Sequence, residues 1–312
     1  MRDTATKAAG SKPERILKST VRSIRKDYIA YIMIAPALIC YLVYLWHPMF
    51  SGIMLSFYKT QGFEKASFAG ISNYITVLKD PLFYKALRNS AKYTLWALVI
   101  ESVLPIILAV FINEIVRGKK LFTTIIYLPC MIPGIVASVM WKIMFDPSDA
   151  GLFNTILERL GAPSLSWLQD PRLTIMLIVV SISWAGIGSK TILYIANLQS
   201  VSVDLYEAAS LDGAGFWSRV KNITLPHMSG LIKMLIVMQI IGVFKIFQQP
   251  LTMTGGGPDN ESITLMIYAY QKAFEHFRVD ESAAVSVLVM IILMIFTAVY
   301  FKVTNSKENG NV

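Results

Sequence analysis

The sequence is poor in charged residues. Asp, Glu, Lys and Arg make up 16% of its 312 residues, whereas a soluble globular domain normally carries about 25%. The mean hydropathy is correspondingly high, at +0.53, and apolar residues stand in long runs. These features exclude an ordinary soluble domain of this size and predict an integral membrane protein.

Cysteine, histidine and nucleotide-binding motifs are also scarce or missing. Cys40 and Cys130 both fall inside apolar runs, so we expect reduced, unreactive thiols. The three histidines are scattered, which predicts neither a metal site nor a catalytic triad. No Gly-x-x-x-x-Gly-Lys-[Ser/Thr] motif occurs, and no lysine follows the run Gly255–Gly257. We therefore expect no catalytic residue, no metal and no cofactor in this chain, and no enzyme activity of its own.

Six apolar segments are long enough to cross a bilayer. A transmembrane helix needs roughly 20 apolar residues to span about 30 Å of hydrocarbon. We therefore predict an all-α integral membrane protein with six transmembrane helices. The segments are Tyr28–Met54, Lys92–Ile115, Leu121–Phe145, Leu173–Leu198, Met228–Gln249 and Ala283–Val303. This divides the chain into a basic tail (1–27), a six-span membrane domain (28–303) and a short C-terminal tail (304–312).

Basic residues flank these segments mainly on one side. The N-terminal tail is rich in Lys and Arg, Arg117, Lys119 and Lys120 follow the second segment, and Lys302 and Lys307 end or follow the sixth. Because such residues concentrate in cytoplasmic flanks, both termini are predicted to be cytoplasmic. A more dilute set of lysines in the first outer loop argues the other way, but the tail is denser. The net charge of +9 is thus attributed to topology, and no nucleic-acid partner is expected.

The loop 200–227, between the fourth and fifth segments, is unusually polar and falls in the cytoplasm in this topology. Asp204 and Glu207 form an Asp-x-x-Glu pattern that predicts a capped short helix. A Gly-Ala-Gly stretch ends it, and a second short helix begins at Phe216 and is ended by Pro226. Two such helices suit either a groove on a soluble partner or the lipid surface. Physical reasoning alone favours neither.

The amino-acid sequence of this loop resembles the EAA loop of permease subunits in ATP-binding-cassette (ABC) importers. The match consists of Glu207-Ala208-Ala209, Asp212-Gly213-Ala214 and Ile223-x-Leu225-Pro226. In that family the loop forms a coupling helix that docks into a cleft on the ATPase subunit. The resemblance implies an ATPase-coupling role for Glu207, Ala208, Ala209, Asp212, Gly213, Ala214, Phe216, Trp217, Leu225 and Pro226.

The resemblance extends over roughly Tyr28 to Val303 and points to the carbohydrate-uptake branch of that family. It rests on Phe68-Ala69-Gly70 with Asn73-Tyr74, on Leu128-Pro129 with Asp146-Pro147, and on Thr254-Gly255-Gly256-Gly257-Pro258-Asp259. It implies a type I ABC importer permease fold in a compact six-span form. The implied function is a permease subunit that couples ATPase motion to alternating access for a carbohydrate, expected to be an oligosaccharide, in the bacterial plasma (inner) membrane.

The implied partners are a second homologous permease subunit, two copies of an ATPase that binds ATP and Mg, an extracytoplasmic solute-binding protein and the carbohydrate itself. An outer-face loop and short helix, 250–279, are expected to help form a docking surface. Its apolar residues recur at helical spacing, and the helix is too short to cross the bilayer. These residues are Ile263, Met266, Ile267, Tyr270, Phe274 and Phe277.

Polar residues in the fourth and fifth segments indicate the substrate path. Polar groups inside a membrane usually face the bundle interior or a water-filled route. The resemblance to the maltose importer points to the same two segments, but Ser189 stands where an aromatic residue is expected, and Val243 and Ile246 stand where amides are expected. The candidate substrate-path residues are Trp184, Ala185, Gly186, Ser189, Lys190, Gln239, Gly242, Val243, Lys245 and Ile246.

Lys190 and Lys245 leave the charge of the substrate open. Each ammonium group either snorkels to the interface, faces the cavity or pairs with an acid. Cavity-facing lysines would favour an acidic sugar or a sugar phosphate. Glu101 is the clear intramembrane acid of the sequence and can neutralise one lysine, but not both.

An alternative function is an ion-coupled secondary transporter that works alone. Such proteins carry inverted repeats, broken helices and coupling carboxylates near the membrane midplane. The sequence shows no repeat and offers Glu101 as its intramembrane acid. Copurification of an ATPase chain would separate the two alternatives.

Overall fold

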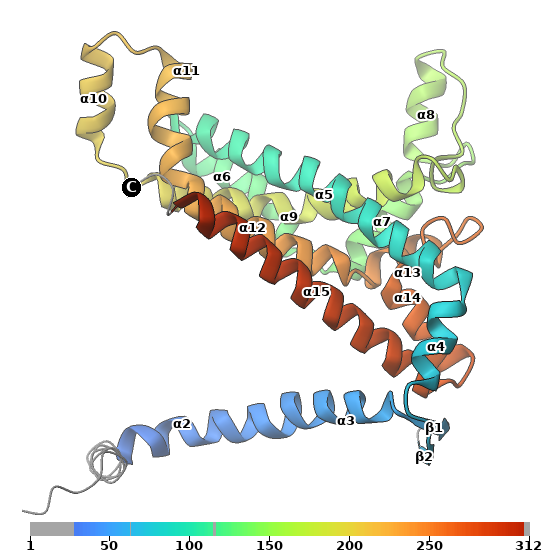
Figure 1. The fold of residues 1–312 in the computed structure, drawn as a ribbon. Helices are drawn as coiled ribbons and strands as arrows, with labels where there is room; N and C mark the ends of the chain where they lie inside the picture. The colour runs from blue at the N-terminus through green and yellow to red at the C-terminus, as the bar shows by residue number, and fades with distance from the viewer. Residues whose placement is uncertain (1–27, 63, 115–116, 309–312) are drawn as a thin grey trace, which may run out of the picture. The chain divides into compact units, whose positions relative to one another are not determined.

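The computed structural model describes residues 28–62, 64–114 and 117–308. The chain divides into two compact units, residues 1–54 and 55–312, and each is described by itself. The described part of the first unit is a helical rod of α2 (Tyr28–Tyr41), η1 (Leu42–Trp46) and α3 (His47–Leu55) (Figure 1). None of these elements has a buried residue. The predicted basic tail 1–27 and residues 309–312 of the predicted C-terminal tail lie outside the described residues.

The second unit is almost entirely helical and contains one small hairpin. In chain order its elements are β1 (Tyr58–Gln61), β2 (Glu64–Phe68), α4 (Ser72–Lys79), α5 (Pro81–Glu114), α6 (Lys119–Tyr127), η2 (Leu128–Met131), α7 (Gly134–Met144), α8 (Leu152–Arg159), η3 (Trp167–Gln169), α9 (Thr174–Leu198), α10 (Val203–Leu211), α11 (Phe216–Arg219), η4 (Val220–Thr224), α12 (Leu225–Phe244), α13 (Gln248–Thr254), α14 (Leu265–Tyr270), η5 (Gln271–Glu275) and α15 (Val279–Glu308).

The predicted membrane-spanning segments are confirmed as helices, with one change of shape. Five helices among the described residues are long and apolar enough to cross a membrane, and a bent pair makes a sixth if it is counted as one span. The five are Tyr28–Leu55, Pro81–Glu114, Thr174–Leu198, Phe216–Phe244 and Val279–Lys302. The second span begins at Pro81 rather than Lys92, because proline is well tolerated in the first helical turn.

The third predicted span is broken. Lys119–Met131 and Gly134–Met144 meet at an angle of 94°, and Ile132 between them has an extended backbone with φ −77° and ψ 127°. The residue before a proline is driven away from helical angles, and Pro133 follows Ile132 directly. The predicted third transmembrane helix, Leu121 to Phe145, is therefore a bent pair of helices.

The prediction that Pro226 ends a separate short helix was also wrong. Pro226 stands in the first turn of α12, where the missing N–H costs little. The π-helical turn η4 joins α11 to α12, so Phe216–Phe244 forms one helix of 29 residues. This helix ends at Phe244 instead of the predicted Gln249, and Gln248 already belongs to α13.

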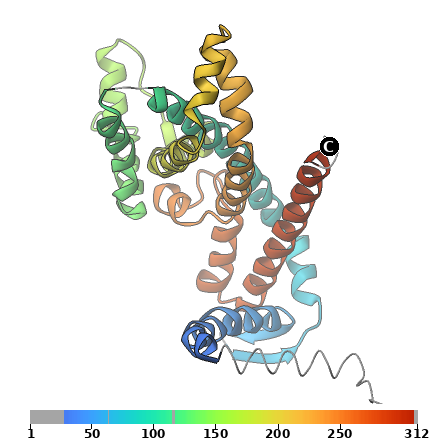
Figure 2. The same cartoon turned by 90° about the vertical axis from the view of Figure 1, so that its left-hand side faces the viewer.

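The core of the second unit follows α5, α9 and α12, which lie side by side (Figures 1 and 2). One buried cluster brings Tyr93 and Ala97 of α5 against Ile178 of α9 and Val243 of α12. A second joins Ala109, Tyr194 and Met228 of the same three helices. These helices therefore form the walls around which the site is built.

Two features on the predicted outer side were missed or misplaced by the sequence analysis. The antiparallel hairpin β1–β2, with Tyr58 opposite Phe68, was not predicted. The amphipathic helix is confirmed as α14 and η5, but its buried face carries Ile267, Tyr268 and Ala273. Phe274 and Phe277, predicted to be on the apolar face, are 54% and 65% exposed. Ile263 and Ile267 of the predicted set are buried, and Met266 and Tyr270 are half-buried. The predicted apolar face is therefore confirmed in its first part and wrong at Phe274 and Phe277.

Candidate functional site

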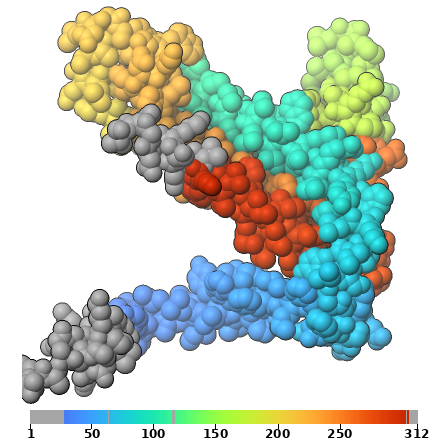
Figure 3. Space-filling view, viewed as in Figure 1, coloured from blue at the N-terminus to red at the C-terminus, as the bar shows by residue number. Residues whose placement is uncertain are grey.

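The 200–227 loop projects from the other helices of the second unit (Figures 1 and 3). Its first helix, α10, is capped by Ser202, whose hydroxyl accepts a hydrogen bond from the Asp204 N–H at 3.2 Å. The predicted cap, Asp204, instead lies in the first turn, where its charge favours the helix dipole. The predicted glycine break is confirmed, since Gly213 has φ +79°, a left-handed angle that glycine adopts without strain.

The surface of this loop is apolar where a soluble protein would normally be polar. Leu211 is 89% exposed, Trp217 73% and Val203 66%. A cavity of about 530 Å³ opens beside them, lined by residues of α10 and by Arg219 of α11. Exposed aromatic and leucine side chains around a groove are typical of protein docking sites.

The ten predicted coupling residues are all described, and most face outward. Glu207, Ala208, Asp212, Gly213, Trp217, Leu225 and Pro226 are exposed, whereas Ala209, Ala214 and Phe216 are half-buried. Nothing in the described residues covers the exposed set.

The loop is fastened to α5 and to its own second helix. Phe216 stacks on Phe111 of α5 with ring centroids 6.2 Å apart. Arg219 lies 3.9 Å from the carboxylate of Glu114, also on α5, and donates a 2.7 Å hydrogen bond to the Ser210 hydroxyl of α10. These contacts join α10 and α11 to the end of α5.

A cavity of about 450 Å³ lies farther along the same helices. We name it the polar cavity, because six of its eleven lining residues carry a charged or an amide side chain. It is lined by Glu101, Ile182, Lys190, Gln239, Gly242, Val243, Lys245, Ile246, Phe247, Gln248 and Gln249. Its volume falls within the range of small-molecule sites in proteins.

The structure brings six predicted substrate-path residues together in this cavity and leaves four outside it. Lys190, Gln239, Gly242, Val243, Lys245 and Ile246 line it; Trp184, Ala185, Gly186 and Ser189 do not. For Trp184 the helical repeat gives the reason, because it lies on a different face of α9 from Ile182 and Lys190. Trp184 packs edge-on against Trp141 of α7, with centroids 5.8 Å apart. The Ser189 hydroxyl donates to the Gly186 carbonyl at 2.9 Å.

Glu101 of α5 forms an ion pair with Lys190 of α9 across the cavity wall. The two side chains are 6% and 18% exposed. Ser183 also donates to the Glu101 carboxylate at 3.4 Å. A methyl group added at Gly186 would lie 4.0 Å from that carboxylate, so Gly186 leaves the space beside it open. The pair neutralises both charges within the protein.

Gln239 is held by α5. Its amide nitrogen donates to the Ala97 carbonyl at 2.6 Å, and its amide oxygen accepts from Ser102 at 3.1 Å. It is 7% exposed. Gln239 thus positions α12 against α5, while the amides of Gln248 and Gln249 supply the more accessible polar groups. The sequence signalled both glutamines as polar residues at the end of the fifth span, but they were not among the predicted site residues.

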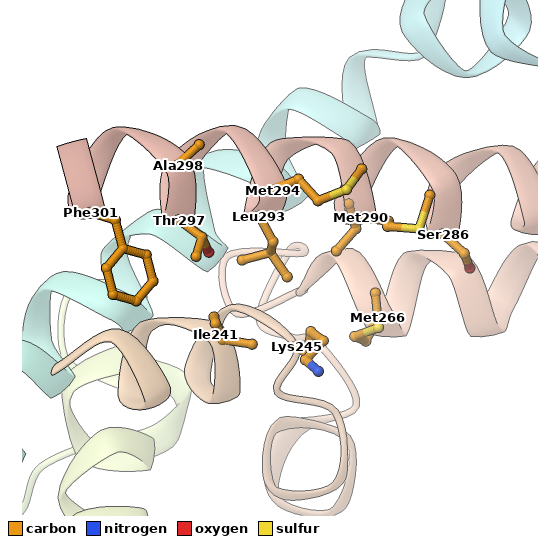
Figure 4. Close-up of a pocket in the computed structure, with 11 residues that line it drawn as sticks. Ile241, Lys245, Met266, Ser286, Met290, Leu293, Met294, Thr297, Ala298 and Phe301 are labelled. Atoms are coloured by element: carbon orange, nitrogen blue, oxygen red, sulfur yellow. The ribbon is translucent and has the colours of Figure 1, made fainter. Parts of the chain in front are cut away.

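Lys245 lies between the polar cavity and a second, apolar groove. The apolar groove has a volume of about 640 Å³ and is lined mainly by Ile241, Met266, Leu293 and other apolar residues of α12, α14 and α15. Figure 4 shows the Lys245 side chain pointing away from the α15 wall of this groove. No carboxylate among the described residues pairs with Lys245.

A cluster of charged residues joins the ends of several helices on the predicted outer side. Lys272 lies 3.2 Å from Asp80 and 3.1 Å from Glu281, and the Tyr268 hydroxyl donates to Asp80 at 2.7 Å. Burial alone would raise the pKa of Asp80, but hydrogen bonds from Tyr268, the Leu82 N–H and Lys272 outweigh it and lower that pKa. Burial would lower the pKa of Lys272, and its two carboxylate partners outweigh it and raise that pKa.

The chain resembles known proteins along most of its length. The family described as "Binding-protein-dependent transport system inner membrane component" matches residues 101–307. The arabinooligosaccharides transport system permease protein of Bacillus subtilis is 31% identical over 283 residues, 90% of each chain. The lactose transport system permease protein of Rhizobium radiobacter is 31% identical over 300 residues, 94% of this chain and 99% of the relative.

A solved structure shares the fold. A chain from a bacterial ABC transporter involved in the import of the acidic polysaccharide alginate matches with a TM-score of 0.80 and 25% identity. The match covers 92% of this chain and 99% of that chain.

Proposed function

Because the chain belongs to the family of inner membrane components of binding-protein-dependent transport systems, we propose that it is a permease subunit of an ATP-driven carbohydrate importer. Its fold is that of type I ABC importer permeases, and it is a multi-pass membrane protein. Its relatives are transport subunits of arabinooligosaccharide and lactose systems, which supports an oligosaccharide as the substrate and the bacterial inner membrane as its location.

The observation that carries the proposal is the connection between the 200–227 loop and the polar cavity. The loop contacts α5 through Phe111 and Glu114 and continues without a break into α12. The same two helices supply Glu101 and Gln239 to the cavity. An exposed docking element joined to two walls of a substrate-sized cavity is the arrangement that a coupling subunit requires.

The energy for transport comes, in this proposal, from a separate ATPase chain that binds ATP and Mg. Ala208 and Ala209 allow a close approach of that chain, and the exposed Trp217 supplies apolar area for it to bury. Closure of an ATPase dimer moves the loop, and α5 and α12 change the shape of the cavity. A second permease subunit provides the facing half of the path, and a solute-binding protein delivers the sugar to the outer face.

Replacing Glu207 by Lys tests the coupling role. Glu207 is exposed on α10 and lines the groove of the 200–227 loop, so the change reverses a charge where the ATPase is proposed to dock. We expect at least a tenfold loss of ATP-dependent sugar uptake and of substrate-stimulated ATP hydrolysis, since about 1.4 kcal/mol of lost affinity is tenfold. The measurement uses proteoliposomes containing the complete transporter.

Glu275→Lys is the matched control, because Glu275 is exposed on η5, outside the loop. It is expected to retain the ATPase subunit on copurification, whereas Glu207→Lys is expected to lose it. Uptake driven by a proton or sodium gradient through this chain alone, without ATP, would overturn the proposal. Glu101, the acid that such coupling would use, is already engaged by Lys190 and Ser183.

A further inference from the structure

The charges in the polar cavity do not cancel. Glu101, Lys190 and Lys245 are its charged lining residues. Glu101 and Lys190 neutralise one another. Lys245 has no carboxylate partner among the described residues, so the cavity keeps one uncompensated positive charge. An anionic group beside Lys245 would compensate this charge.

Lys245 lies where the polar cavity meets the apolar groove. It follows the last residue of α12, where the helix stops and the chain turns toward α13. Its side chain points away from the apolar residues of α15 (Figure 4), and the residue borders the polar cavity.

The groups around Lys245 suit the hydroxyl groups and the ring of a sugar acid. Gln248 and Gln249 lie on the same side of the cavity and offer amide donors and acceptors for hydroxyl groups. Both amides reach toward the start of α7, where a methyl group at Gly134 would lie 3.6 Å from the Gln248 oxygen. Phe247 adds an aromatic side chain to the wall. A carboxylate beside Lys245 would form a charge-assisted hydrogen bond.

We propose that the polar cavity selects a carbohydrate carrying a carboxylate, and that Lys245 is the residue that recognises it. The inference rests on the proposed function and deepens it, because it assigns the substrate class of the same site. Glu101 has the complementary role, because its ion pair with Lys190 keeps the Lys190 ammonium from binding the substrate carboxylate. One free cation then matches one carboxylate of a uronic acid residue.

The test compares two trisaccharides that differ only in charge. One carries a single hexuronic acid residue, and the other is the same trisaccharide with that carboxylate reduced to a primary alcohol. Their binding to the detergent-solubilised transporter, without the solute-binding protein, is measured by calorimetry. We expect the acidic trisaccharide to bind about tenfold more tightly, the usual scale of one charge-assisted hydrogen bond. Lys245→Met should remove this preference, and Lys245→Arg should keep it.

Lys142→Met serves as the control, because Lys142 is exposed at the end of α7 and outside the polar cavity. It should leave the preference unchanged. Equal binding of both trisaccharides by the wild type, or an unchanged preference in Lys245→Met, overturns this inference. ATP-dependent uptake of the neutral trisaccharide in that case leaves the proposed function standing. Uptake of amino acids or peptides, but of neither sugar, overturns both.

Discussion

The Glu101–Lys190 pair decides which lysine is free. Removing one partner of a buried ion pair leaves the other charge uncompensated. We expect Glu101→Gln to lower the free energy of unfolding by about 2–3 kcal/mol, below the range of about 3–5 for full burial, because Lys190 borders the polar cavity. The measurement is denaturation of the purified protein in detergent.

The double variant Glu101→Gln with Lys190→Met removes both charges and should recover at least half of that loss. If the effects of the two single changes simply add, the side chains do not stabilise each other and the pair has no energetic role.

At the residue scale, the sequence predicted which charged residues lie in the membrane-spanning segments, but not which of them form an ion pair. Glu101 stood out as the clear intramembrane acid, so neutralisation of one lysine was expected. The choice of Lys190 over Lys245 depends on the rotation of α9 against α5, which helical periodicity alone does not give. The same rotation turns Trp184 away from the cavity, because residues of one helix that are close in sequence can face different neighbours.

Close packing between two elements depends on one glycine of α9. A methyl group at Gly188 would lie 2.3 Å from the Ile126 carbonyl oxygen and 2.8 Å from the Tyr127 Cα of α6. Neither backbone atom can move without separating the helices. We expect Gly188→Ala to destabilise the protein by about 3 kcal/mol, at the upper end of the range for overpacking. Thermal unfolding in detergent measures this.

Gly230→Ala in α12 is the matched control, since apart from its chain neighbours and the backbone of its own helix no atom lies within 4 Å of the added methyl group. It should be neutral or stabilise by up to about 1 kcal/mol through helix propensity. An equally stable Gly188→Ala protein would show that α6 and α9 are not in this close contact.

The sequence predicted which segments are helices better than it predicted where a helix breaks or continues. Apolar length alone identified the spans. Proline has two opposite roles here, since Pro133 accompanies the 94° break whereas Pro226 lies harmlessly in a first turn. The difference comes from the position of each proline within its helix, and the apolar pattern does not mark that position. The hairpin β1–β2 was missed because its strands are only four and five residues long.

For the whole molecule, the outer-end charge cluster predicts a pH dependence. The lowered pKa of Asp80 contributes stability that is present above the ordinary value of 3.8 and is lost as pH falls below it. The raised pKa of Lys272 contributes stability that is present below the ordinary 10.5 and is lost as pH rises through the higher folded-state value. Stability from this cluster is therefore constant between these limits.

Asp80→Asn should consequently lower Tm near neutral pH, and its deficit against the wild type should shrink as pH falls from about 6 to about 3. The exposed Asp149→Asn change provides the control and should follow the wild-type curve at all pH values. A deficit of Asp80→Asn that stays constant with pH would rule out a contribution from the charge of Asp80.

The unbroken helix Phe216–Phe244 also has the geometry of a lever. Its 29 residues at about 1.5 Å per residue give an arm of roughly 43 Å. A tilt of about 5° around the Phe216 end displaces the far end, next to Lys245, by roughly 4 Å. A tilt this small can leave Phe216 in contact with Phe111. It would still move the Lys245 ammonium by more than the length of a hydrogen bond.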